Sequence, residues 1–267
     1  MSEPAIDPTP PAPGPGEALR GIASLPFLVS CGNWFFRYRD YVFPLVFVAL
    51  AVLARPAFLL GNRYLDCAVD ALGLLVALSG QFLRAAVIGL AYIRRGGKNK
   101  QIYASALVQD GFFRHSRNPL YLGNGLVLLG LMLIHGSPVF LLAGGAFYLF
   151  AYVAITAAEE RFLYGRFGAE YLEYMRAVPR YVPRLAGFRE TVQGMSFDLL
   201  RVVRKEYNST FTWVTCALAL FLWQDFRNLG AEAARHELGV IVPLFLVAAV
   251  LYGVVRTLKK RKLLGHT

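Results

Sequence analysis

The sequence predicts an all-α integral membrane protein with about six transmembrane helices. The chain has 267 residues, of which 56% are hydrophobic and 17% are charged, whereas soluble domains usually carry about 25% charged residues. Its apolar residues gather in runs of roughly 17 to 25, the length that crosses a bilayer as a helix. Basic residues gather in alternate connecting segments. These observations favour a bundle of membrane-spanning helices over one large soluble core.

The first 40 residues are expected to lie outside the spans. Residues 1–18 are rich in proline and lack the basic-then-apolar pattern of a signal peptide, so we expect a disordered tail. Residues 19–40 hold the run Trp34-Phe-Phe beside two arginines, a composition typical of the membrane interface. We therefore predict an interfacial segment at 19–40, followed by a transmembrane core at 41–184.

The candidate spans are apolar segments, and only Gly136-Ser137 separates the third from the fourth. So short a join forces a tight antiparallel hairpin. Residues 185–208 repeat apolar side chains at helical spacing and predict an amphipathic cytoplasmic connector, lying on the bilayer surface or docked on its own domain. Residues 209–267 are expected to form a two-helix extension with a basic tail. The predicted spans are about 41–60, 66–93, 119–135, 138–158, 209–225 and 239–256.

Lysine and arginine orient these helices, because cytoplasmic loops carry an excess of both. With the N-terminus inside, the cytoplasmic side holds six basic residues between positions 94 and 117, nine in 159–208 and five in the C-terminal tail. We therefore predict that both termini and the active site are cytoplasmic. The net charge of +11 also suits anionic lipid head groups as partners. Nucleic-acid binding is not expected, because no basic platform interleaved with aromatic residues occurs.

The cysteines do not predict a site. Cys31, Cys67 and Cys216 are odd in number and far apart, so they form neither a disulfide framework nor a metal-binding set. We expect them to fill apolar space. The sequence shows no metal-ligand spacing and no Gly-rich phosphate loop, so no metal is expected.

Two polar patches flank the predicted hairpin. The first, 107–123, opens the third span, and the second, 159–174, closes the fourth, so the hairpin should bring them together. Adjacent carboxylates at a membrane boundary are costly unless paired, and they could bind a cation or an amine, or accept a proton. They could equally face water or pair with Arg161 and Arg166. The residues that we expect to meet at the cytoplasmic surface are Arg117, Asn118, Tyr121, Glu159 and Glu160.

Local signals indicate how the third span begins. Pro119 suits the first turn of a helix, where its missing N–H costs nothing. The candidate caps for exposed helical N–H groups are Ser116, Asn118 and Asp110. Gly123 and Gly125 permit close approach by a neighbouring helix or by a ligand.

Together the two patches resemble the membrane-embedded methyltransferases that include isoprenylcysteine carboxyl methyltransferases and phospholipid N-methyltransferases. The resemblance covers about residues 80–184, and the ordered set of motifs at these spacings is fairly specific. The matching residues are Leu107-Val108, Phe113, Arg117-Asn118-Pro119-Leu120-Tyr121-Leu122-Gly123, Glu159-Glu160, Phe167-Gly168, Tyr171, Tyr174 and Val178-Pro179.

The resemblance implies S-adenosylmethionine as cofactor and a membrane lipid or other apolar molecule as methyl acceptor. It implies a cofactor pocket lined by Leu107, Val108, Phe113, Asn118, Pro119, Leu120, Tyr121, Gly123 and Glu159. The catalytic residues that we expect are Glu159, Glu160 and Arg117. An apolar aromatic slot suits adenine, and a carboxylate suits an ammonium group. Arg84, on the second span, could face the cofactor carboxylate or reach the membrane surface.

Departures from the family pattern bear on the substrate. Prenylcysteine enzymes usually have histidine where this chain has Asn118, and an arginine one turn before the Glu pair, where Ile155 stands here. Phospholipid methyltransferases share Asn-Pro-x-Tyr-x-Gly and a His-x-Ser-Pro turn, seen here from His135. A lipid amine is therefore slightly favoured over a prenylcysteine carboxylate as the acceptor.

Two other classes stay open. NADPH-dependent reductases of the sterol reductase type share a similar C-terminal Tyr and Pro pattern, although they usually differ at the position of Leu120. A non-catalytic membrane scaffold would keep the fold without the chemistry, and Ile155 in place of an arginine is compatible with it. Either Glu159 or Glu160 could act as the base.

Overall fold

The computed structural model describes residues 25–57, 61–90, 95–98, 101–193 and 195–264. In these ranges the secondary structure is helical apart from one ribbon of two antiparallel strands, β1 (Arg95–Lys98) and β2 (Gln101–Ala104). The predicted all-α class is therefore confirmed. The predicted tail at 1–18 lies outside the described residues.

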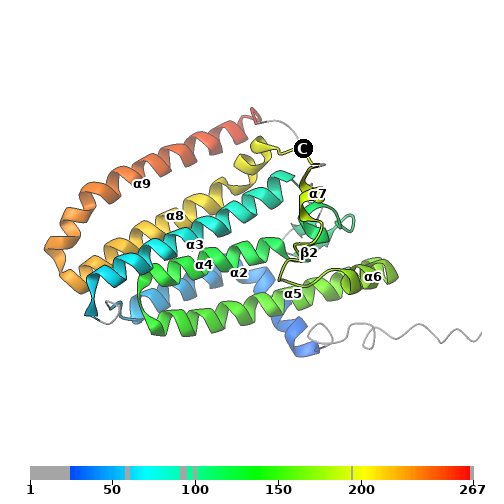
Figure 1. Cartoon of the computed structure of the whole chain (residues 1–267), viewed down its shortest axis with the longest axis horizontal. Coiled ribbons are helices and arrows are strands. Elements are labelled where there is room, and N and C mark those ends of the chain that lie inside the picture. Colours follow the sequence, from blue (N-terminus) through cyan, green and yellow to red (C-terminus); the bar gives the residue numbers. More distant parts are fainter. Residues whose placement is uncertain (1–24, 58–60, 91–94, 99–100, 194, 265–267) are drawn as a thin grey trace, which may run out of the picture.

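The long helices lie side by side in one bundle (Figure 1). They are α2 (Pro26–Leu53), α3 (Arg63–Leu90), α4 (Pro119–His135), α5 (Gly145–Phe167), α8 (Leu199–Leu229) and α9 (Ala231–Lys260). The shorter elements are η3 (Gly111–Arg114), the π-helical turn η4 (Phe140–Gly144), α6 (Ala169–Ala177) and α7 (Phe188–Gln193). The most extensive packing joins α3 to α4, α8 to α9 and α2 to α5.

Among the described residues, three helical segments are long and apolar enough to cross a membrane: Arg63–Leu90, Phe140–Phe167 and Ala231–Lys260. The shorter helix α4 is also apolar. On α9, large apolar side chains such as Leu246 and Val250 are exposed, as expected where lipid chains are the solvent. The chain is therefore an integral membrane protein.

The first helix does not follow the predicted boundaries. An interfacial segment ending at residue 40 and a span at 41–60 were expected, but α2 runs unbroken from Pro26 to Leu53. Proline removes one helical hydrogen bond, yet Pro44 does not end the helix. Leu28 and Phe36 before it and Phe47 after it are buried, and this packing holds the helix together through the proline.

The amphipathic stripe predicted within 185–208 is divided between two helices. Residues 188–193 form α7, and the chain enters α8 at Leu199 and continues through the predicted fifth span. Asp198 starts this second helix, because its side chain accepts a hydrogen bond from the Arg201 N–H at 2.8 Å. The Asp198 N–H donates to the Gly89 carbonyl at 2.9 Å, which fixes this end of α8 against α3.

The hairpin of α4 and α5 forms as predicted. α4 ends at His135, and Gly136 reverses the chain in a left-handed conformation with φ of 71°. His135 is fully buried, with Nε2 2.9 Å from the Ala51 carbonyl oxygen, so it packs at the turn. The second arm continues to Phe167 rather than ending near 158, so the Glu pair lies within a helix.

Small residues let α3 and α4 pack backbone against backbone. A Cβ on Gly130 would lie 2.3 Å from the Gly73 carbonyl oxygen, and one on Gly80 would lie 2.6 Å from that of Gly123. Helices in lipid associate largely through such close packing. Gly123 therefore has a packing role against α3, whereas a Cβ on Gly125 would meet nothing within 4 Å.

Candidate functional site

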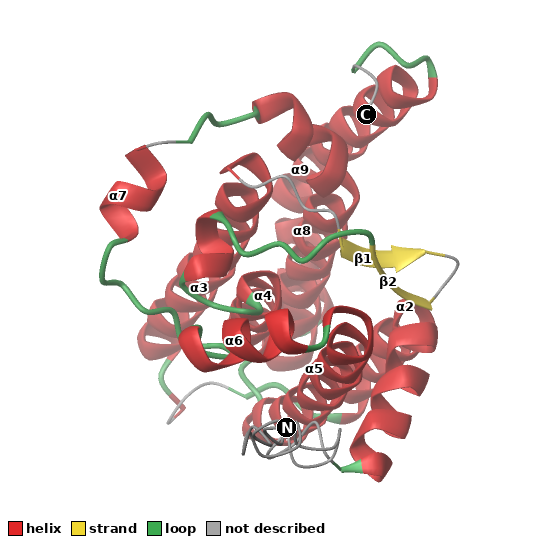
Figure 2. Ribbon diagram, turned by 90° about the vertical axis from the view of Figure 1, so that its right-hand side faces the viewer, coloured by secondary structure: helices red, strands yellow, loops and turns green. Residues whose placement is uncertain are grey.

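The start of α4 is fixed to the segment that follows α6. The Arg117 N–H donates to the Pro179 carbonyl and the Arg184 N–H donates to the His115 carbonyl, both at 2.9 Å. The Ser116 hydroxyl adds a third hydrogen bond to the same segment. Figure 2 looks onto this end of the bundle, where α6, α7 and the β ribbon lie.

Glu160 of α5 is the centre of a buried ion-pair group. It is 2% exposed, and its Oε1 lies 2.9 Å from Nη1 of Arg117. Arg180 donates to both oxygens, from Nε at 3.0 Å and from Nη2 at 2.5 Å. Burial lowers the pKa of the Arg180 guanidinium. The hydrogen bond and the charge of Glu160 raise this pKa by more than burial lowers it, so the pKa lies above its ordinary value. Glu160 thus joins α5, the start of α4 and the segment after α6.

Glu159 has different surroundings although it is the adjacent residue. The hydroxyl of Tyr121 on α4 donates to its Oε1 at 2.7 Å. Glu159 is half-buried, whereas Glu160 is buried. The ring of Tyr121 lies beside that of Tyr152, with the centroids 5.3 Å apart. One carboxylate is therefore compensated by two arginines, and the other accepts from a tyrosine hydroxyl.

The apolar residues expected in the cofactor pocket fall into two adjoining clusters. Val108, Phe113 and Leu120 pack together against α3. Leu107 packs instead among the side chains of α5 and α6 that include Tyr174. The Tyr174 hydroxyl connects the clusters by donating to the Phe113 carbonyl at 2.7 Å. Tyr174 of the second patch thus holds the backbone of the first patch in place.

Asn118 and Pro119 form the first turn of α4. The Asn118 side chain does not cap the helix; its Nδ2 donates to the Arg180 carbonyl at 3.1 Å. Pro119 is buried at the first helical position, as its residue type favours. The hairpin therefore brings Arg117, Asn118, Tyr121 and the Glu pair to one end, while Gly123 lies further along and faces α3.

Arg180 was missed by sequence reasoning. It lies 20 residues after Glu160, beyond α6, so helical spacing does not relate the two. The partners considered from sequence, Arg161 and Arg166, belong to α5 itself. The signal that could have pointed to Arg180 is its place directly after Val178-Pro179, where the chain must leave α6 and return to the bundle.

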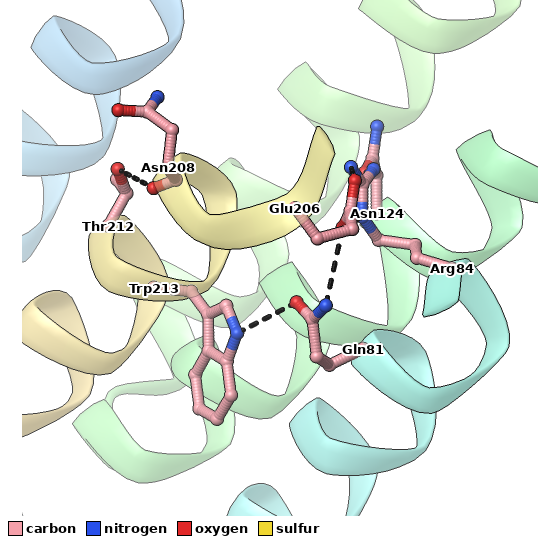
Figure 3. A network of polar contacts seen from close by, with 7 residues as sticks. All are labelled: Gln81, Arg84, Asn124, Glu206, Asn208, Thr212 and Trp213. Atoms are coloured by element: carbon pink, nitrogen blue, oxygen red, sulfur yellow. Dashed lines mark hydrogen bonds and ion pairs between the residues drawn. The ribbon is translucent and has the colours of Figure 1, made fainter. Parts of the chain in front are cut away.

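Arg84 does not reach the membrane surface but is held within the bundle, with its side chain 14% exposed. Its guanidinium pairs with Glu206 of α8 at 2.7 and 2.8 Å and also bonds to Asn124 of α4 (Figure 3). Gln81 extends the network, donating to Glu206 at 3.2 Å and accepting from the Trp213 indole at 3.0 Å. Glu206 is 122 residues from Arg84, so the sequence did not predict this pair. The network fastens α8 to α3 and α4.

The comparison with protein-family models matches residues 70–170 to the family described as phospholipid methyltransferase. No curated protein and no solved structure matches the chain significantly. The matched region includes most of α3, all of α4 and α5, and both carboxylates of the candidate site, whereas α8 and α9 lie outside it. The resemblance seen in the motifs is thereby confirmed, and residues 70–170 of this chain match the phospholipid methyltransferase family.

Proposed function

We propose that this protein transfers the methyl group of S-adenosylmethionine to a lipid, and that the acceptor atom is the nitrogen of a lipid amine. One observation carries the proposal: within the region matched to the family, the Tyr121–Glu159 pair and the Arg117–Glu160–Arg180 group meet at one end of the α4–α5 hairpin. This end combines a partly exposed carboxylate with a rigid, charge-compensated support.

The residues at this end suit the proposed cofactor. Leu120, which packs on the buried Val108 and Phe113, offers an apolar surface to a purine ring, and Glu159 offers a carboxylate to a cationic ligand. When bound, S-adenosylmethionine supplies an electrophilic methyl carbon on a sulfonium sulfur. Phe113 is 1% exposed and Val108 is 8% exposed, so these two side chains would support the pocket wall without contacting much of the ligand.

We assign the role of base to Glu159. An amine is protonated near neutral pH, and its nitrogen must lose a proton before the lone pair can attack the methyl carbon. That attack forms the N–C bond while the C–S bond breaks and leaves its electron pair on sulfur. Glu159 can accept the proton, whereas arginines occupy both oxygens of Glu160. Alignment of the two reactants supplies much of the rate of such an in-line transfer.

Arg117 and Glu160 then act as positioning residues. Their ion pair fixes the start of α4, which carries Tyr121, against the part of α5 that carries Glu159. The distance between Tyr121 and Glu159 is set by this support.

The surroundings of Ile155 favour an amine over a carboxylate acceptor. Ile155 is fully buried in an apolar cluster with Phe35 and Ala151, between α2 and α5. A prenylcysteine carboxylate needs a cation to compensate its charge, and an aliphatic side chain cannot supply one. A lipid amine has no such requirement.

For the topology, we propose six spans formed by α2, α3, α4, η4 with α5, α8 and α9. The asymmetry of lysine and arginine supports cytoplasmic termini and a cytoplasmic candidate site. At 28 and 31 residues, α2 and α8 are long enough to cross the hydrocarbon core at about 1.5 Å per residue. In this arrangement α2 to α6 form the methyltransferase core, and α8 and α9 form an added two-helix extension.

The test is a transfer assay with purified protein, S-adenosylmethionine labelled in its methyl group, and either phosphatidylethanolamine or a farnesylated cysteine as acceptor. We expect label in phosphatidylethanolamine, and we expect the label to resist mild base because an N-methyl group is not hydrolysed. Glu159→Gln should abolish transfer. Glu173→Gln, which alters an exposed carboxylate on α6, is the matched control and should retain it.

Other outcomes select the other readings. Base-labile label in the farnesylated cysteine would replace the amine by carboxyl O-methylation. No label in any acceptor, with no cofactor bound, would point to a scaffold. Stabilisation of the protein by NADPH alone would point to a reductase.

A further inference from the structure

A basic cavity lies between α8 and α9, outside the region matched to the family. It is open to the surface of the bundle, and its volume is about 560 Å³. It is lined by Tyr207 and Asn208 of α8 and by Tyr252, Arg256, Lys259 and Lys260 of α9. In Figure 1, α9 lies at the edge of the bundle opposite α5, with α8, α3 and α4 between them. The cavity is therefore separate from the candidate active site.

The cations of this cavity have no carboxylate partner among its lining residues. Nη1 of Arg256 donates to the Tyr252 hydroxyl at 3.2 Å. Nζ of Lys259 donates to the Arg204 carbonyl at 3.1 Å, and Lys260 is exposed. The carboxylate of α8 closest in sequence, Glu206, is buried and paired with Arg84. The cavity therefore presents three positive charges.

Aromatic rings give the cavity a firm wall. Tyr207 and Tyr252 lie 5.4 Å apart between centroids, and Phe211 stacks on Tyr252 at 4.6 Å. The Tyr252 hydroxyl also donates to Oδ1 of Asn208 at 3.4 Å. Nζ of Lys259 lies 4.9 Å from the centre of the Tyr207 ring. Neighbours thus hold the hydroxyl, the amide and two of the cations in place before a ligand binds.

The place of the cavity suits a lipid rather than a free ion. It lies where α8 begins and α9 ends, at the same end of the bundle as α6 and α7 (Figure 1). Leu251 and Val254 of α9, next to Tyr252 in the chain, are exposed and offer an apolar surface for acyl chains. Aromatic and basic side chains together are typical of the head-group layer. The phosphate group of a lipid head group forms charge-assisted hydrogen bonds with Arg and Lys.

We propose that this cavity binds the phosphate of an anionic membrane lipid, whose acyl chains lie along the exposed face of α9. This is a second lipid site, distinct from the site of the methyl acceptor, and it does not depend on the proposed function. Arg256, Lys259 and Lys260 bind the phosphate, and Tyr252 and Asn208 fix Arg256 and the wall beside it.

The proposal can be tested by native mass spectrometry of the full chain in detergent, titrated with phosphatidylglycerol, phosphatidylcholine or inorganic phosphate. The variant Arg256→Gln/Lys260→Gln removes two cations from the cavity. The matched control Arg261→Gln/Lys262→Gln removes the same charge from the next residues of the chain, which do not line the cavity. Wild type should retain phosphatidylglycerol in preference to phosphatidylcholine, and inorganic phosphate should not displace it.

We expect the cavity variant to bind phosphatidylglycerol roughly thirtyfold more weakly, because it lacks two cations, each of which contributes about 1 kcal/mol near anionic lipid. The control should stay within about twofold of wild type. Tyr252→Phe keeps every charge but removes the hydroxyl that holds Arg256, and it should weaken binding severalfold. Equal weakening in both charge variants would overturn the proposal, since net charge alone would then explain binding. Displacement by inorganic phosphate, or an unaltered Tyr252→Phe, would also overturn it.

Discussion

Two adjacent carboxylates on α5 differ in what surrounds them. Glu160 is 2% exposed and bound by Arg117 and Arg180, whereas Glu159 is partly exposed and accepts from Tyr121. A buried carboxylate between two arginines compensates charges that would otherwise be costly to bury. At the scale of the residue, Glu160 therefore has a structural role, whereas Glu159 is suited to proton transfer.

These different roles predict different effects for the same substitution at Glu160 and at Glu159. Glu160→Gln removes the carboxylate charge that lies between Arg117 and Arg180, so it should lower the free energy of unfolding by about 3 kcal/mol. Glu159→Gln should leave unfolding almost unchanged while it abolishes methyl transfer. Thermal unfolding in detergent, measured beside the transfer assay, separates the two. Equal destabilisation by both substitutions would contradict the assignment.

The Arg84–Glu206 pair predicts a strong coupling between distant parts of the chain. Glu206→Gln leaves the guanidinium of Arg84 in the bundle without its carboxylate, so it should lower the unfolding temperature markedly. Adding Arg84→Gln to that variant should recover part of the loss, because the uncompensated charge is then gone. Additive losses in the double variant would show that the pair does not act as a unit.

Some of the site contacts were predictable and others were not. The meeting of Arg117 and Tyr121 with the Glu pair followed from the short Gly136-Ser137 turn, because a tight hairpin must align the ends of its arms. Arg180 and Glu206 depend on how the chain returns to the bundle after α6 and α7. No local pattern encodes that return, so single-sequence reasoning could not place them.

At the scale of the element, α3 and α4 form the most extensively packed pair of helices around the site. Their contact depends on glycine and alanine on facing sides, because larger side chains would separate the backbones. Gly123 is part of this contact and lies two residues from Tyr121. The position of Tyr121 beside Glu159 therefore depends on α3 as well as on the hairpin.

Two alanine substitutions on α4 test this packing. Gly130→Ala places a methyl group 2.3 Å from the Gly73 carbonyl oxygen and should destabilise the protein by about 1–3 kcal/mol. Gly125→Ala, on the same helix, meets nothing within 4 Å and should be neutral or slightly stabilising. Unfolding in detergent compares them directly. If both variants unfold like wild type, the close approach of α3 and α4 does not contribute to the stability of the protein.

The helices themselves were predicted better than their ends. α4 begins at Pro119 and ends at His135, as expected, because proline favours the first turn and Gly136 ends the helix. α2 and α8 extend beyond the apolar runs from which they were predicted. In α2 the polar turns continue the helix because Leu28, Phe35 and Phe36 beside them pack on the bundle. The polar start of α8 is held by the Glu206–Arg84 pair, and hydropathy alone registers neither contact.

At the scale of the whole molecule, α8 and α9 extend the bundle beyond the region that matches the family model. Their two attachments differ, since α8 is tied to the core by the Arg84–Glu206 network while α9 packs mainly on α8. The extension therefore completes the bundle on the side away from α5 (Figure 1). We propose that it adds a lipid site without contributing to the candidate active site.

The proposed orientation predicts which positions react from each side of the membrane. After replacement of the native cysteines by alanine, Arg176→Cys and Lys260→Cys should react with a membrane-impermeant maleimide only when the cytoplasmic side is accessible. Asn62→Cys should react from the opposite side. All three positions are exposed, so access to the side chain does not limit the reaction. The reverse pattern would place the candidate site away from the cytosol and weaken the assignment of the cofactor.

The proposed function requires the end of the α4–α5 hairpin to bind S-adenosylmethionine. Calorimetric titration of purified protein with S-adenosylhomocysteine, the product of methyl transfer, tests it most directly. We predict saturable binding with one site per chain, weakened at least tenfold by Leu120→Asp and Tyr121→Ala but unchanged by Glu173→Gln. Absence of binding to wild-type protein that is folded and monodisperse in detergent would contradict the account.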